Sequence, residues 1–139
     1  MARRGTVTKD GPFEPVRSVE ELETWLEKPG PVLLYLHDPW CPINAASYRE
    51  LAPFTGPIPI VDVSTGRAIS HYVEDRTGIR HESPQAILFN DGEPVWHASH
   101  YRITGFAVAD ALDKLAESAN GGGGEPDTAE PDDAPAATP

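Results

Sequence analysis

One segment, Leu33-Leu34-Tyr35-Leu36-His37-Asp38-Pro39-Trp40-Cys41-Pro42-Ile43-Asn44, joins a strongly apolar run to a turn that carries the chain's only cysteine. Val32 to Leu36 is continuously apolar and lies between two prolines, which favours a short strand buried on both faces. Pro42 favours a helix start, because the first N–H groups of a helix have no intrahelical partner to lose. A thiol at Cys41 then faces unpaired N–H groups, which favour the thiolate. Cys41 is our candidate nucleophile.

A free cysteine is also commonly a small buried hydrophobe, and this alternative stays open at this point. Trp40 and Pro42 argue against it, because a bulky aromatic beside a thiol suits the flank of an exposed sulfur better than a core position. Asn44 stands where a Cys-x-x-Cys pair would have its second cysteine, so one cysteine would have to suffice.

The rest of the chain alternates strands and helices. Two apolar strands, Val32 to Leu36 and Ile58 to Val63, flank a helix that starts at Pro42, which indicates a parallel βαβ unit. Pro59 either moves the second strand to the sheet edge or lies at its start. The other predicted elements are a helix after the capping box of Ser18 and Glu21, a helix from Arg67 to Thr77 ended by Gly78, a hairpin around Asn90-Asp91-Gly92, and a last helix capped by Thr104.

This order is the thioredoxin arrangement, an α/β fold with a central mixed four-stranded sheet flanked by helices. Phe13 to Val16 offers an extra N-terminal edge strand, interrupted by Pro15. We expect residues 1–12 to be a flexible arm, residues 13–119 to be the thioredoxin-like domain, and residues 120–139 to be a disordered tail rich in acidic residues, glycine and proline.

Charge and hydropathy restrict the partners. The formal net charge is −11, and five carboxylates after Asn120 contribute −5 of it, so the rest of the chain carries −6. The chain has no stripe of clustered Lys and Arg, so we expect no binding to nucleic acid. No apolar run is long enough to cross a bilayer and no apolar segment follows the basic start, so we expect a cytoplasmic protein. Reducing conditions there keep a thiol available.

Histidines and one proline form the second group of candidates. Ser83-Pro84 precedes the hairpin, where thioredoxin-like proteins place a cis-proline opposite the reactive cysteine. His37 ends the strand that leads to Cys41, where it would either tune the thiol or bond to backbone. His97 and His100 invite a metal site, but the ligand spacing of a zinc site is missing, so we expect no metal.

These residues resemble the monothiol bacilliredoxins of the YtxJ type over Ser18 to Leu115. The resemblance rests on Leu36-His37, on Cys41-Pro42-Ile43, and most specifically on the segment from His81-Glu82-Ser83-Pro84-Gln85 through His97-Ala98-Ser99-His100 to Ile103-Thr104. The family is implicated in removing bacillithiol, a low-molecular-weight thiol, from S-thiolated proteins. The turn departs from the family at Asp38-Pro39-Trp40 and at Asn44, and a carboxylate at Asp38 close to the sulfur would disfavour the thiolate.

The resemblance implies a monothiol thiol-disulfide oxidoreductase that works through a mixed disulfide on Cys41. Its partners would be S-thiolated client proteins and a small thiol, with bacillithiol as co-substrate, no bound cofactor, and the protein acting as a monomer. The expected substrate contacts are Trp40, Pro42, Asn44, Ser83 and Pro84, with His37 and His100 as tuning residues. The rival hypothesis is a non-catalytic thioredoxin-like stress or adaptor module with a passive cysteine.

Overall fold

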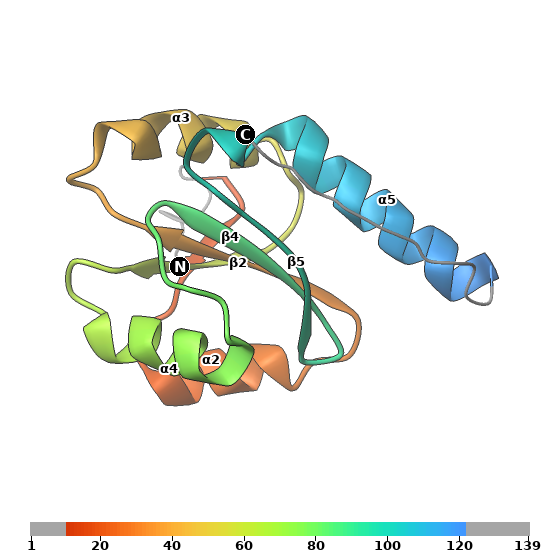
Figure 1. The fold of residues 1–139 in the computed structure, drawn as a ribbon, viewed down its shortest axis with the longest axis horizontal. Coiled ribbons are helices and arrows are strands. Elements are labelled where there is room, and N and C mark those ends of the chain that lie inside the picture. The colour runs from red at the N-terminus through yellow and green to blue at the C-terminus, as the bar shows by residue number, and fades with distance from the viewer. Residues whose placement is uncertain (1–10, 122–139) are drawn as a thin grey trace, which may run out of the picture. The chain divides into compact units, whose positions relative to one another are not determined.

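A computed structural model describes residues 11–121, with side chains to residue 118. The described elements follow the predicted order (Figure 1). They are β1 Phe13–Pro15, α2 Val19–Leu26, β2 Pro31–His37, α3 Pro42–Leu51, β3 Ile58–Asp62, α4 Arg67–Thr77, β4 Gln85–Asn90, β5 Glu93–Ser99, the 3-10 turn η1 His100–Arg102 and α5 Gly105–Gly121.

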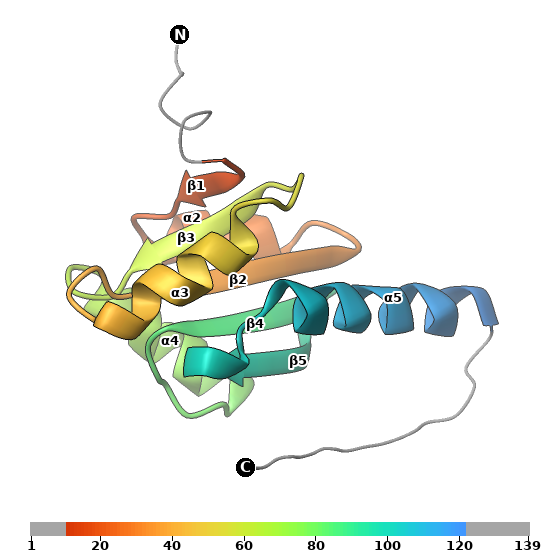
Figure 2. The same cartoon turned by 90° about the horizontal axis from the view of Figure 1, so that it is seen from above.

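The sheet has five strands in the order β1-β3-β2-β4-β5, with β1 at one side (Figure 2). β1 and β2 run parallel to β3, whereas β4 runs antiparallel to both β2 and β5, so the sheet is mixed as predicted. The optional N-terminal strand is present, and it pairs Phe13 with Ile58. It makes β3 an interior strand.

Pro59 is tolerated inside the sheet because of where its missing N–H would point. Ile58 donates its N–H to Pro12 and Val16 donates to Ile60, so even-numbered residues of β3 face β1. Pro59 therefore faces β2, and the pairing of β3 with β2 begins only at Ile60. Of the two predicted accommodations for this proline, a place near the strand start is the one observed.

Side chains of β2 pack into the layers on both sides of the sheet, because successive side chains of a strand point to opposite faces. Val32, Leu34 and Leu36 belong to the core cluster that contains residues of α2 and α4. Tyr35 lies on the other face, where its hydroxyl reaches Ser47 of α3. Figure 1 shows α3 on one side of the sheet and α2 with α4 on the other. The prediction that this strand is buried on both faces is confirmed, since Val32 to Leu36 are all buried.

Capping and turn residues that are recognisable in the sequence define several helix and strand ends. Ser18 Oγ accepts from the Glu21 N–H at 3.1 Å, while Glu21 accepts from the Arg17 N–H rather than from Ser18 itself. The β4–β5 hairpin turns at Asp91 and Gly92, whose φ angles are 52° and 84°, the signs that a two-residue I′ turn requires.

Thr104 Oγ1 accepts from the Ala107 N–H at 3.0 Å, which caps α5 as predicted. The described residues divide into two units at Ala107, near the start of this helix. α5 continues to Gly121, so it includes the first two residues of the predicted tail. The expected arm, up to residue 10, and the expected tail, from residue 122, lie outside the described residues.

Candidate active site

The turn before α3 is held by the residue that follows β2. The Asp38 carbonyl accepts from the Cys41 N–H at 3.0 Å, and its carboxylate accepts from the Trp40 N–H at 3.0 Å. The carboxylate that raised concern in the sequence is thus engaged with backbone beside Trp40. These two hydrogen bonds define the conformation in which Cys41 is presented.

Cys41 is the N-cap residue of α3, and Pro42 is the first helical residue. The thiol is free and partly buried, and it makes no capping hydrogen bond. Pro42 has no N–H, and the Asn44 N–H is bonded to the Cys41 carbonyl at 3.0 Å. Of the first three residues of α3, Ile43 is therefore the one whose N–H has no acceptor among residues 11–121, as is usual in the first turn of a helix.

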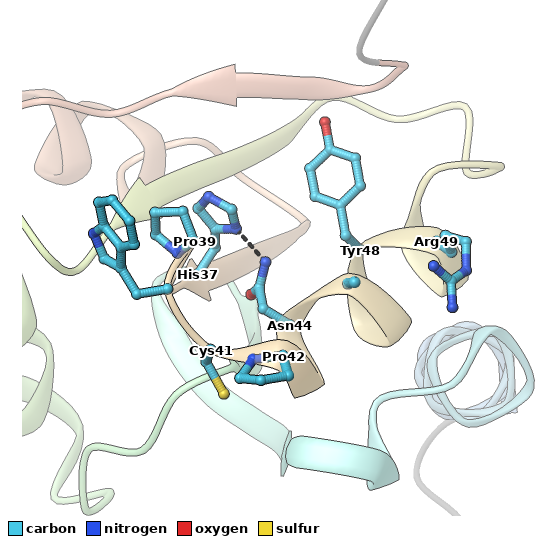
Figure 3. Close-up of a pocket in the computed structure, with 9 residues that line it drawn as sticks. His37, Pro39, Cys41, Pro42, Asn44, Tyr48 and Arg49 are labelled. Atoms are coloured by element: carbon cyan, nitrogen blue, oxygen red, sulfur yellow. Dashed lines mark hydrogen bonds between the residues drawn. The ribbon is translucent and has the colours of Figure 1, made fainter.

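A shallow groove of about 510 Å³ adjoins the thiol. Trp40 stands at its mouth with 82% of its surface exposed, which is unusual for so large an apolar side chain. Figure 3 shows the Cys41 sulfur pointing away from the side on which His37 and Asn44 lie. The groove is lined by His37, Pro39, Trp40, Cys41, Pro42, Asn44, Ala45, Tyr48 and Arg49.

The imidazole ring of His37 bonds to a side chain rather than to the thiol or to backbone. Its Nδ1 lies 2.6 Å from Asn44 Nδ2, the contact drawn as a dashed line in Figure 3. Burial lowers the pKa of His37 below its ordinary value, against the opposing influence of Asp62. At neutral pH His37 is therefore uncharged, and it supplies no cation to a thiolate at Cys41.

Asn44 lies in the interior, although the sequence suggested a substrate contact. It is only 5% exposed, and its Oδ1 accepts from the Tyr35 hydroxyl at 2.9 Å. Tyr35 in turn lies 2.6 Å from Ser47 Oγ. Neither Tyr35 nor Ser47 was a predicted site residue. Strand alternation was the available signal, because it places Tyr35 and His37 together on the face that α3 covers.

Ser83 and Pro84 reach the same end of the sheet as Cys41. Leu36 pairs with Gln85, so Pro84 lies beside the end of β2, from which the cysteine turn departs. The Ser83–Pro84 peptide is cis, as the resemblance implied. The Pro84 carbonyl accepts from the His100 N–H at 3.0 Å, which ties η1 to this loop.

His100 approaches a carboxylate rather than the thiol. Its Nδ1 lies 4.0 Å from Glu82 Oε1, and both side chains are nearly half exposed. A pair this exposed contributes little to stability. Across the described part of the chain, no three His, Cys, Asp or Glu side chains gather in a group able to hold a metal ion.

Comparison with known proteins decides the family. The family described as "Monothiol bacilliredoxin BrxC" matches residues 14–108, which is more than half of the chain. The chain belongs to the monothiol bacilliredoxin family. The match spans Cys41, His37, the cis-proline loop and His100. It makes the protein a member of a family of thiol oxidoreductases.

Solved structures confirm the thioredoxin fold of this bacilliredoxin. One described as "A putative oxidoreductase with a thioredoxin fold" is 30% identical, with a TM-score of 0.68, over 72% of this chain and 93% of that one. The thioredoxin of Trypanosoma brucei brucei is 14% identical, with a TM-score of 0.64, over 76% and 91%. A mutant thioredoxin of Halobacterium salinarum is 24% identical, with a TM-score of 0.54, over 78% and 90%. No described helix is both long and apolar enough to span a membrane.

Proposed function

We propose that this bacilliredoxin removes a low-molecular-weight thiol, with bacillithiol as our first choice, from S-thiolated proteins through a mixed disulfide on Cys41. The observation that carries this proposal is the placement of one free, partly exposed thiol at the N-cap of α3, beside the open Ile43 N–H. The attacking form of a cysteine is the thiolate, and a helix N-terminus is a common place for reactive cysteines.

The reaction needs no second cysteine in the protein. The Cys41 thiolate attacks the sulfur of the small thiol in the client's mixed disulfide, forms a new disulfide to it, and releases the client thiolate. The thiolate of a second small-thiol molecule then attacks the sulfur of the small thiol that is bound to Cys41. The two small thiols leave as a symmetrical disulfide and Cys41 is released as a thiolate, so every bond broken is matched by one formed.

The groove beside Cys41 and the cis-proline loop supply the surfaces for the two substrates. Trp40 and Pro42 flank the thiol and would contact the small thiol, since both line the groove. Ser83 and Pro84 would contact the client, because the strand register brings them to the end of β2. We assign Asn44 and His37 a different role below, since their side chains are bonded to one another.

Transfer of the adduct tests this function. A client protein carrying one bacillithiol on a single cysteine is mixed with the reduced protein, and both intact masses are followed. We expect the adduct mass to leave the client and to appear on the protein, and Cys41→Ser to abolish both changes. Parallel clients carrying glutathione or coenzyme A identify the preferred small thiol.

A non-catalytic adaptor gives a different result. Its Cys41 would gain no adduct from the client at any time, and the client would keep its own. Loss of the adduct from the client at the same rate with Cys41→Ser would also overturn the proposal, because free small thiol alone would then explain the loss.

A further inference from the structure

The orientation of the Asn44 amide follows from a neighbour whose chemistry is unambiguous. A backbone N–H can only donate, and the Asp38 N–H lies 3.3 Å from Asn44 Oδ1. The Tyr35 hydroxyl lies 2.9 Å from the same atom. The oxygen of the amide therefore faces these two donors, and its NH2 group faces Nδ1 of His37 at 2.6 Å.

The state of the His37 ring follows in turn. An NH2 group can only donate, so Nδ1 of His37 must accept and carries no proton. The ring proton is then on Nε2. A protonated His37 would set two donors against each other at this contact, which disfavours the imidazolium.

We propose that Asn44 is a positioning residue that holds His37 as the neutral Nε2–H tautomer and anchors the turn that presents Cys41. One amide thus joins the last residue of β2, the first residue of the turn and the first turn of α3. This inference goes beyond the proposed function, and it can be tested on the folded protein without any substrate. It also gives position 44 a task other than that of a resolving cysteine.

Buried amide networks of this kind demand complete pairing, because an unpaired buried donor or acceptor is costly. Asn44 is nearly inaccessible, and both ends of its amide are bonded. Ser47 completes the network, since its hydroxyl reaches both Tyr35 and the Asn44 carbonyl. Each polar side-chain atom of Asn44 has a hydrogen-bond partner in this network, and these partners determine the orientation of the amide.

Nearby carboxylates favour the protonated form of the His37 ring. Asp62 and Asp38 favour the imidazolium, whereas burial opposes it. The contact geometry decides for the neutral ring, because the NH2 group of Asn44 can only donate toward Nδ1. The titratable and charged groups near the ring, or lining the same groove, are Asp38 in the turn, Asp62 on β3, Tyr35 on β2, Tyr48 and Arg49 on α3, and Cys41 at the N-cap.

Asn44→Asp reverses the sign of the contact with almost no change in shape. The ionised carboxylate still accepts from Asp38 and Tyr35, but toward His37 it can only accept, so Nδ1 must carry a proton while that carboxylate is ionised. Because the new charge is in direct contact with the ring, we expect the titration midpoint of His37 to rise by about 1 to 3 pH units. Ser47→Ala is the matched control, since it removes a buried hydrogen bond of the same network but leaves the amide of Asn44 in contact with His37.

Nitrogen NMR of 15N-histidine-labelled protein distinguishes the two states, because a protonated ring nitrogen and an unprotonated one resonate far apart. At pH 7 we expect the wild type and Ser47→Ala to show an unprotonated Nδ1 and a protonated Nε2 at His37. We expect Asn44→Asp to show both nitrogens protonated at the same pH. His37→Gln identifies the signals of the ring.

The same variants report on Cys41 through its rate of disulfide formation with 2-hydroxyethyl disulfide. We expect Asn44→Asp to change this rate by severalfold more than Ser47→Ala does. A wild-type His37 with a protonated Nδ1 would overturn the proposal even if no variant folded. An Asn44→Asp protein whose His37 titrates as in the wild type would overturn it equally.

Discussion

Replacing Tyr35 by phenylalanine removes one buried hydroxyl and leaves the ring in place. The side chain is fully buried, and the hydroxyl contacts Asn44 Oδ1 at 2.9 Å and Ser47 Oγ at 2.6 Å. Neither partner becomes wholly unpaired, since Asn44 Oδ1 keeps the Asp38 N–H and Ser47 keeps the Asn44 carbonyl. We therefore expect the free energy of unfolding at pH 7 to fall by about 1 to 2 kcal/mol.

Alkaline pH reduces this advantage of the wild type in the free energy of unfolding. Burial raises the pKa of Tyr35 from 10.0 to about 12. A group whose folded pKa is raised stabilises the fold below its unfolded pKa, and this contribution is lost as pH rises from about 10 toward 12. At pH 11 the phenol of the unfolded chain is already mostly ionised, which lowers the free energy of unfolding by about 1.4 kcal/mol. Tyr35→Phe has no such phenol.

The two stability curves should therefore converge. Urea unfolding of the wild type and Tyr35→Phe, measured from pH 7 to pH 11, gives the difference in free energy of unfolding at each pH. We expect that difference to shrink by about 1.4 kcal/mol between pH 9 and pH 11. Tyr101→Phe is the control, because this tyrosine is 70% exposed and its loss should leave the difference from the wild type constant. A constant difference for Tyr35→Phe as well would refute the assignment of a buried neutral phenol.

Two other substitutions test separate parts of the structure. Asn44→Cys places a thiol three residues after Cys41 in the first helical turn, so we expect oxidation to close a disulfide and to lower the mass by two hydrogens. In the reduced variant we expect the free energy of unfolding to fall by about 1 to 3 kcal/mol, because the amide contacts are lost. Stable small-thiol adducts on both cysteines in the mass spectrum would contradict the disulfide. Gly92→Ala and Gly30→Ala both place a side chain on a residue whose φ angle is 84°. Only at Gly92 would the added Cβ contact the Leu26 carbonyl oxygen, at 3.1 Å. Thermal unfolding should show a lower melting temperature for Gly92→Ala, and equal losses would rule out that contact.

Sequence patterns predicted the elements that local chemistry controls. The capped helix at Ser18, the strand Val32 to Leu36, the cysteine at a helix start and the turn at Asp91-Gly92 all depend on residues close together in the chain. Each signal combines hydrophobic period with a residue whose backbone preference is strong. The same signals yielded the order of strands and helices, and from it the thioredoxin arrangement.

The interior role of Asn44 could not be predicted in this way. Asn44, Ser47 and Leu51 form the buried face of α3, but two of the three are polar, so the apolar pattern of the helix pointed elsewhere. Their partners are Tyr35 and His37, which only the three-dimensional contact between β2 and α3 brings near. His37 was predicted either to tune the thiol or to bond to backbone. The hydrogen bond of its ring to Asn44 was not predicted, because proximity along the chain says nothing about the direction of a side chain.

The accommodation of Pro59 shows the same limit, because it depends on a strand that the sequence left optional. Once β1 pairs with β3, the odd and even positions of β3 acquire different neighbours. A proline at an even position would then face β1 and lose a hydrogen bond, whereas position 59 faces β2, where pairing has not yet begun.

The outermost strands of the sheet are poor templates for another chain. β1 has three residues and ends in Pro15, while β5 carries Pro94 and a register irregularity opposite Leu88 and Phe89. Prolines and bulges interrupt the row of N–H groups that an incoming strand would need, and natural sheets use them to prevent edge-to-edge aggregation. A client of the proposed function would thus be held at the thiol rather than added as a further strand along an edge of the sheet.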